Sequence, residues 1–142
     1  MSDEAIRALL RRWAEAIASG NFGEIGELAA PDYLAYQAGF PGPVTRDQHL
    51  QFAEGFFAAF PDAQLTVDDI LVEGDRGMMR WTFHGTHRGE LMGIPATGRQ
   101  VTMTGIEVNR VRDGKIVEHW VEMDQLGLMQ QLGVIPAPGQ AA

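Results

Sequence analysis

The hydrophobic pattern of this chain changes its period at Pro61, and that change limits the folds it can adopt. Before Pro61, apolar residues recur every three to four positions, which is the period of helices. After it come short runs rich in Val, Ile, Thr and aromatic residues, separated by turn signals. Helices first and antiparallel strands afterwards predict an α+β fold.

Three helices are expected in the first part of the chain. Residues 3–19 carry their apolar side chains on one face and have acids in the first turn. A second helix follows a cap at Asn21 and stops before Pro31, because proline cannot continue a helix. A third follows a cap at Thr45 and stops at Pro61, and its face is unusually aromatic.

Strands are expected over residues 64–73, 77–84, 100–112 and 115–123. The last two are joined by Asp113-Gly114, a strong hairpin signal because glycine supplies the positive φ of a tight turn. Residues 85–99 hold four Gly and one Pro and read as a long, functional loop.

Composition excludes several classes of function. The chain of 142 residues has 19 acidic against 11 basic residues, a formal net charge of -8, which argues against binding of nucleic-acid phosphates. Without cysteine it has no disulfide, thiolate metal site or thiol nucleophile, which suits a reducing compartment. Neither a secretory signal nor an apolar run of about 18 residues is present, so we expect a cytoplasmic protein with no membrane partner.

Four phrases occur in a characteristic order along the chain. In sequence letters they are AFPDAQ at 59–64, GTHRGELMGIPATGR at 85–99, DGKIVEHWVEMD at 113–124 and LGLMQQLG at 126–133. Together with the helical first part, they resemble the SnoaL-like polyketide cyclases, a branch of the nuclear transport factor 2-like superfamily. The resemblance covers nearly the whole chain.

This resemblance implies a cone-shaped α+β barrel, in which a strongly curved antiparallel sheet wraps an apolar cavity that the N-terminal helices close. We expect this domain to span residues 1–133, with 134–142 as a C-terminal tail. The family implies a homodimer or higher homo-oligomer and no cofactor.

Asp124 is the first candidate catalytic residue. In family members described as aldol cyclases, the aspartate of the phrase HW-x-x-x-D is the general acid/base, and here that phrase ends at Asp124. An apolar pocket raises the pKa of a carboxyl toward neutrality, as such a role requires. On this hypothesis Asp124→Asn would lower turnover at least about a hundredfold. The alternative is that Asp124 caps a short helix over residues 125–132.

Glu107 is the second candidate, because it stands where the family usually carries the histidine of the phrase G-I-H-I. Ionised Glu only accepts hydrogen bonds, whereas neutral His also donates. If Glu107 faced Asp124 across adjacent strands, repulsion and burial would keep one of the two carboxyls protonated. The alternative is a solvated Glu107 or an ion pair with Arg80 or Arg110.

The sequence does not decide which face of the last strand lines the cavity. Its two-residue period puts Trp120, Glu122 and Asp124 on one face, and His119, Val121 and Met123 on the other. The aromatic residues of the chain suggest a wide cavity for an apolar or polycyclic substrate. The residues expected to bind it are Trp13, Tyr36, Gln37, Phe56, Trp81 and Trp120.

A metal site is not expected. The spacing His84-x-x-His87-x-x-Glu90 could suggest one, but it runs from a strand end into a loop and does not lie on one helix face. His87 is expected to hydrogen-bond the loop backbone and to fix the loop's shape.

Three functions remain. The first is a cofactor-independent polyketide cyclase of the aldol, ester-cyclase type that uses Asp124 as general acid/base. The second is an epoxide hydrolase or hydratase in which Glu107 and Asp124 together activate water. The third is a non-catalytic binder of apolar small molecules.

Overall fold

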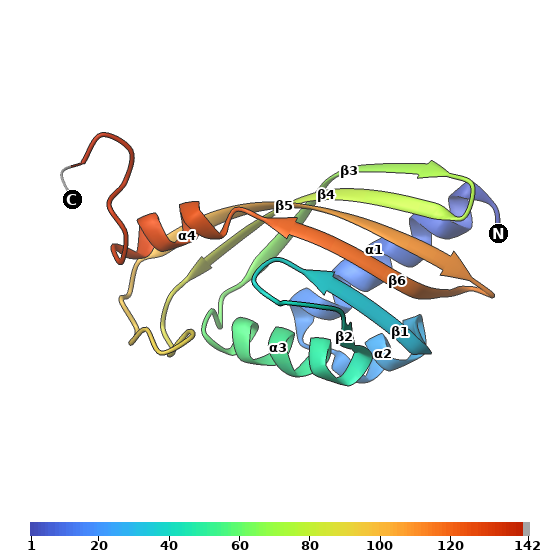
Figure 1. The fold of residues 1–142 in the computed structure, drawn as a ribbon, viewed down its shortest axis with the longest axis horizontal. Coiled ribbons are helices and arrows are strands. Elements are labelled where there is room, and N and C mark those ends of the chain that lie inside the picture. The colour runs from blue at the N-terminus through green and yellow to red at the C-terminus, as the bar shows by residue number, and fades with distance from the viewer. Residues whose placement is uncertain (141–142) are drawn as a thin grey trace.

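The computed structural model describes residues 1–140, which form four helices and six strands (Figure 1). In chain order these are α1 (Asp3–Ser19), α2 (Phe22–Leu28), β1 (Ala29–Gln37), β2 (Val44–Thr45), α3 (Arg46–Ala58), β3 (Gln64–Glu73), β4 (Arg76–Thr86), β5 (Gln100–Arg112), β6 (Lys115–Met123) and α4 (Gln125–Leu132). The three expected helices and four expected strands are all present.

The strands form one curved sheet in the order β2-β1-β6-β5-β4-β3. Strands β3 to β6 form an antiparallel meander, and the expected hairpin at Asp113-Gly114 joins β5 to β6. The predicted α+β class with a strongly curved sheet is confirmed. Two details differ from the expectation: the sheet is mixed, because β1 runs parallel to β6, and it stays open between β2 and β3.

Strand β1 was not expected, because Pro31 lies within it and proline is unusual inside a sheet. The register of β1 against β6 shifts between Ala29 and Leu34. Pro31 falls in this irregular part, where its missing N–H does not interrupt a regular ladder. Regular pairing resumes at Leu34 and places Gln37 opposite Val121.

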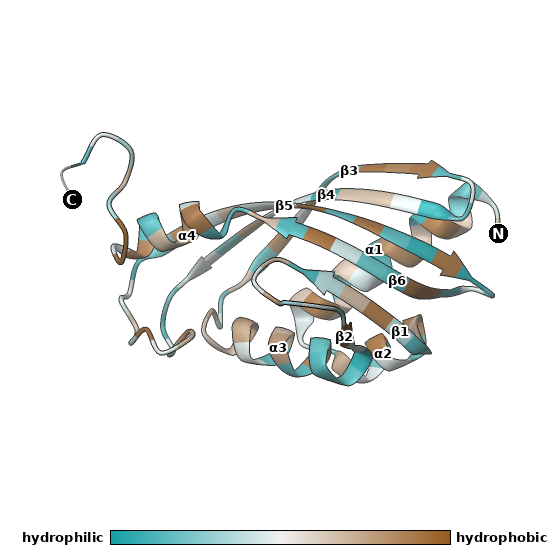
Figure 2. Ribbon diagram, viewed as in Figure 1, coloured by the Kyte–Doolittle hydropathy of each residue, from teal (hydrophilic) through white to brown (hydrophobic). Residues whose placement is uncertain are grey.

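The helices α1, α2 and α3 lie against the sheet, and α4, which follows β6, contacts β5 (Figure 1). Apolar and polar residues alternate along β5 and β6, so one face of these strands is buried in the core (Figure 2). The core contains the apolar face of α1, including Leu10 and Trp13, and aromatic residues such as Phe60 and Phe83.

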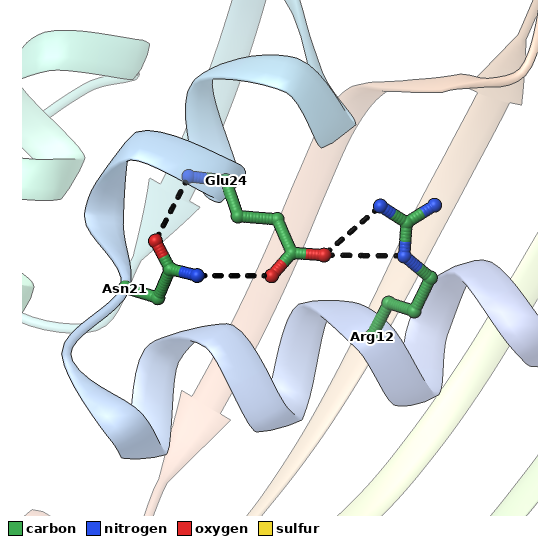
Figure 3. A network of polar contacts seen from close by, with 3 residues as sticks. All are labelled: Arg12, Asn21 and Glu24. Atoms are coloured by element: carbon green, nitrogen blue, oxygen red, sulfur yellow. Dashed lines mark hydrogen bonds and ion pairs between the residues drawn. The ribbon is translucent and has the colours of Figure 1, made fainter.

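A small polar network joins the first two helices (Figure 3). Asn21 caps α2 by accepting the backbone N–H of Glu24, and its amide donates to the Glu24 carboxylate. The same carboxylate accepts two hydrogen bonds from Arg12 of α1, at 2.9 and 3.2 Å. This network links α1 to the start of α2 at the surface of the protein.

Gly77 in β4 is needed for the close packing of α1 against the sheet. A Cβ there would lie 2.6 Å from Cδ1 of Leu10 and 3.0 Å from Cγ2 of Ile6. We expect Gly77→Ala to lower the free energy of unfolding by about 1–3 kcal/mol, measured by urea denaturation. Gly26→Ala in α2 is the control, because a Cβ there meets nothing within 4 Å and alanine favours the helix. Equal stability of the two variants would contradict this packing.

Candidate active site

A pocket lies between the inner face of the sheet and helices α1 and α3. It contains about 630 Å³ of empty space, part of which is open to solvent. Most of its lining is apolar or aromatic and comes from these helices and every strand except β2. The lining residues that carry polar groups are Trp13, Gln37, His49, Trp81, Glu107 and His119. Glu107 is the one carboxylate among the lining side chains of residues 1–140.

Glu107 is almost fully buried, at 5% exposure, and it has hydrogen-bond donors on both oxygens. Trp81 donates its indole N–H to Oε2 at 3.2 Å, and Asn109 donates its amide to Oε1 at 3.1 Å. Burial raises the pKa of Glu107 to about 7, and the bonds from Asn109 and Trp81 oppose that rise. A carboxyl with this pKa exchanges protons readily near neutral pH.

The alternation of β5 places Glu107 in the pocket. Residues 101, 103, 105, 107 and 109 of this strand face inward, and Ile106 between them is exposed. Trp81 reaches Glu107 because its cross-strand partner is Gly105, and a Cβ at Gly105 would overlap the Trp81 ring. This glycine therefore lets the indole lie across β5 with its N–H toward the carboxylate.

Removing the indole donor should raise the pKa of Glu107 further. We expect Trp81→Phe to shift the titration of Glu107 above its value of about 7, because the lost hydrogen bond favoured the ionised form. Carbon NMR of the labelled Glu107 carboxyl measures this shift. Trp120→Phe is the control, since Trp120 stacks on Tyr36 and is not part of the pocket lining. A Trp81→Phe titration at or below the wild-type value would count against the assigned bond.

His119 is held in one tautomer through Asn109. Its Nδ1 lies 2.7 Å from Oδ1 of Asn109, and the amide of that residue is already donated to Glu107. Since a carbonyl oxygen only accepts, Nδ1 of His119 carries the proton and Nε2 is bare. Burial, with a smaller effect from the neighbouring His49, lowers the pKa of His119 well below its usual value, so the ring is neutral.

His49 at the start of α3 forms a second buried pair with Tyr33 of β1. The Tyr33 hydroxyl lies 2.8 Å from Nδ1 of His49, and the two rings stack with an interplanar angle of 10°. Burial lowers the pKa of His49 to about 4, and burial followed by the charge of Glu107 raises the pKa of Tyr33. Both groups are therefore neutral at physiological pH.

Two buried polar atoms of the pocket residues have no protein partner within residues 1–140. They are the indole N–H of Trp13 and the side-chain oxygen of Gln37. Leaving a buried donor or acceptor unpaired costs about 1–3 kcal/mol. The protein itself therefore leaves one donor and one acceptor of these pocket residues unpaired.

Asp124 lies outside the pocket lining. It is exposed and forms the N-cap of α4, where its carboxylate accepts the backbone N–H of Gly127 at 2.9 Å. The expected pairing of Glu107 with Asp124 across adjacent strands is wrong. Glu107 lies opposite Val121, whereas the backbone N–H of Asp124 bonds the carbonyl of Thr104. The reason is the strand's alternation, which turns His119, Val121 and Met123 into the pocket.

Four of the six residues expected to bind substrate line the pocket, namely Trp13, Gln37, Phe56 and Trp81. Tyr36 and Trp120 do not. They are cross-strand partners on the other face of the sheet, with ring centroids 5.7 Å apart, and Arg76 lies over the Trp120 ring. Glu107 is not paired with Arg80 or Arg110. Arg80 pairs with Asp68 and Asp69, and Arg110 pairs with Glu118.

Sequence reasoning missed the roles of His49, Tyr33 and Asn109, and it left the face of His119 open. The available signal for His49 was its place in the aromatic helix, one turn before Phe52 and two turns before Phe56. A histidine on such a face points toward an apolar core, where it needs a polar partner.

The loop after β4 is organised by His87, as expected. Its Nδ1 accepts the backbone N–H of Thr97, and its own backbone bonds Arg99 and Gly98. His84 bonds Thr102 instead and is exposed. No group of three His, Asp or Glu side chains suited to a metal ion occurs within the described part of the chain. None of the helices over residues 1–140 is long and apolar enough to cross a membrane.

The curved α+β sheet and the buried carboxyl of Glu107 in an apolar pocket are suited to acid/base chemistry on an apolar molecule. Comparison with known proteins identifies the family. The profile of the SnoaL-like polyketide cyclases matches residues 7–132. This chain therefore belongs to the SnoaL-like polyketide cyclase family.

Individual relatives agree with this assignment. Aklanonic acid methyl ester cyclase DnrD of Streptomyces peucetius is 32% identical over 133 residues, which cover 88% of each chain. Among solved structures, AclR of Streptomyces galilaeus, a candidate hydroxylase, superimposes with a TM-score of 0.89 at 33% identity, over 98% of this chain and 87% of its own. IdmH of Streptomyces antibioticus, a candidate polyketide cyclase, gives a TM-score of 0.81 at 38% identity, over 89% of this chain and 97% of its own.

Proposed function

We propose that this protein catalyses the intramolecular aldol-type cyclisation of a polyketide ester, with Glu107 as the general acid/base. The observation that carries the proposal is a carboxyl with a pKa of about 7 inside an apolar pocket. The family and the methyl ester cyclases among its relatives support the reaction class. No cofactor takes part in the proposed chemistry.

The steps follow from the position of Glu107. Its ionised carboxylate removes a proton from a carbon between two carbonyl groups, which leaves an enolate. The enolate carbon attacks a ketone carbon of the same molecule, so a carbon–carbon bond forms and the ketone oxygen becomes an alkoxide. Protonated Glu107 then returns the proton to that alkoxide. Substrate and product are isomers, and such acid/base catalysis contributes about 10²–10⁴-fold.

The hydrolase or hydratase alternative depended on a pair of carboxylates around one water molecule. With Asp124 capping α4, Glu107 has no carboxylate partner among the pocket-lining residues of positions 1–140. Its neighbours Trp81 and Asn109 are hydrogen-bond donors. This arrangement favours proton transfer at carbon by a single carboxyl over a shared activation of water.

Mass spectrometry of the product tests the reaction class. The protein is incubated with aklanonic acid methyl ester and with nogalonic acid methyl ester, the compounds in the names of its relatives. We expect a product of unchanged mass and altered chromatographic retention, formed faster than in the same buffer without enzyme. A product heavier by one water would indicate a hydratase, and one heavier by one oxygen a hydroxylase. Binding without conversion would indicate a non-catalytic binder, and each of these results would contradict the proposal.

The proposal also includes a homodimer or larger homo-oligomer and a cytoplasmic location. The absence of cysteine from the sequence agrees with a reducing compartment, which supports the cytoplasmic location.

The outer face of the sheet exposes Ile106 and Leu71, at 49% and 63%, and such apolar exposure is typical of interfaces. Light scattering should give a molar mass that is a multiple of 15.6 kDa. Ile106→Lys should lower this molar mass, because a charge at the interface opposes association. A wild-type mass of one chain would contradict the oligomer.

A further inference from the structure

We infer that His49 and Trp13 donate the hydrogen bonds that hold the enolate oxygen of the substrate, and that Tyr33 positions His49 for this role. This inference rests on the proposed function. It adds the group of the substrate that Trp13 and His49 recognise, namely the oxygen of the carbonyl next to the acidic carbon.

The tautomer of His49 follows from its partner. Within residues 1–140, the hydrogen-bond partner of the Tyr33 hydroxyl is Nδ1 of His49. If His49 were the donor in this bond, the hydroxyl hydrogen of Tyr33 would have no acceptor. Tyr33 is therefore the donor and Nδ1 of His49 the acceptor. A neutral imidazole that accepts at Nδ1 carries its proton at Nε2.

The free edge of His49 belongs to the pocket. His49 is part of the lining and Tyr33 is not, so the ring lies with Nδ1 toward Tyr33 and its other edge available to a ligand. The Nε2–H group is then a neutral donor. A neutral imidazole can polarise a carbonyl oxygen, and without positive charge it leaves the neighbouring carboxyl basic.

Trp13 supplies the second donor. Its side chain is 1% exposed and lines the pocket, and its indole N–H has no partner among residues 1–140. The centroids of the Trp13 and His49 rings lie 6.1 Å apart. An indole N–H donates only, so the molecule that satisfies it must offer an acceptor.

The two donors and the carboxylate belong to one site. The His49 ring lies 5.1 Å from that of His119, which connects through Asn109 to Glu107. Trp13, His49 and Glu107 line the same pocket, so one substrate can meet both the base and the donors. An enolising carbonyl needs both kinds of group, because its proton leaves from carbon while charge builds on oxygen. Preorganised donors at such an oxygen stabilise the transition state.

Binding of 4-nitrophenolate tests the donors without turnover. Glu107→Gln is the background, because its neutral amide resembles the protonated Glu107 of the enolate complex. We expect Glu107→Gln to bind the phenolate, and His49→Leu or Trp13→Phe in this background to weaken binding about 10- to 100-fold. His49→Gln keeps an N–H group and should lose less. His84→Gln is the matched control and should bind as the background does.

Nitrogen NMR tests the positioning role of Tyr33. We expect a protonated Nε2 and a bare Nδ1 on His49, and a loss of this fixed state in Tyr33→Phe. The same variant should show a lower kcat with little change in KM, because the donor acts mainly in the transition state. Circular dichroism confirms that each variant is folded.

The outcomes separate the two claims. Equal phenolate affinity in all variants, or a proton on Nδ1 of His49 in the wild type, would overturn the donor assignment even where Glu107→Gln abolishes turnover. Undiminished cyclisation by Glu107→Gln would instead refute the proposed function, on which the donor assignment rests.

Discussion

Glu107→Gln is expected to lower kcat by about 10²–10⁴-fold. The substitution is nearly isosteric, and the glutamine oxygen still accepts a hydrogen bond from one of the two donors, Trp81 or Asn109. The NH2 group takes the place of the other oxygen, so one donor loses its acceptor. What it removes is the group that takes and returns the proton. The measurement is the initial rate of cyclisation, with circular dichroism to confirm the fold.

Asp124→Asn is the matched control for this experiment. Asparagine caps helices as well as aspartate does, so α4 should remain intact. Because Asp124 is exposed and outside the pocket lining, turnover should stay within a few-fold of the wild type. A hundredfold loss in Asp124→Asn, with an active Glu107→Gln, would return the catalytic role to Asp124.

The stability of the protein should depend on pH through the same residue. The folded-state pKa of Glu107 is about 7 and its ordinary value is 4.5, so between these pH values the folded protein binds more protons than the unfolded chain. Stability contributed by Glu107 is therefore lost as pH rises through this window. The 2.5-unit difference corresponds to about 3 kcal/mol.

Urea denaturation of the wild type and Glu107→Gln at about pH 5 and about pH 8 measures this effect. Glutamine does not titrate, so the variant should gain about 2.5 kcal/mol relative to the wild type between the two conditions. His49 also affects stability, because its folded pKa is about 4 and its ordinary pKa is 6.5. Stability therefore falls as pH falls below 6.5, and this fall should be the same in both proteins. Parallel pH profiles over the whole range would show that Glu107 is not buried as a carboxyl.

Periodicity predicted most of the fold because each element has a strong local signal. The cap at Thr45 and the hairpin at Asp113-Gly114 fix element ends through backbone hydrogen bonds and φ angles that neighbouring residues determine. Strand β1 was not predicted because it forms by pairing with β6, more than 80 residues away in the sequence. Pro31 within it also argues against a strand, since proline is unusual inside a sheet.

The site was predicted less completely, for a physical reason. Glu107 was found because it replaces an expected histidine, but the sequence could not determine which face of β6 turns inward. That choice depends on the register between β5 and β6, which sets Glu107 opposite Val121. The tautomers of His49 and His119 depend on contacts with residues distant or non-adjacent in sequence, which no local pattern reveals.

The pH dependence of kcat/KM tests the role of Glu107 most directly. If Glu107 is the base, kcat/KM for cyclisation should rise with pH and level off above an apparent pKa of about 7, because the ionised carboxylate is the active form. In Trp81→Phe the same rise should move to higher pH. A rate that is already at its plateau near pH 5 would contradict the account, because Glu107 would then not be the titrating base.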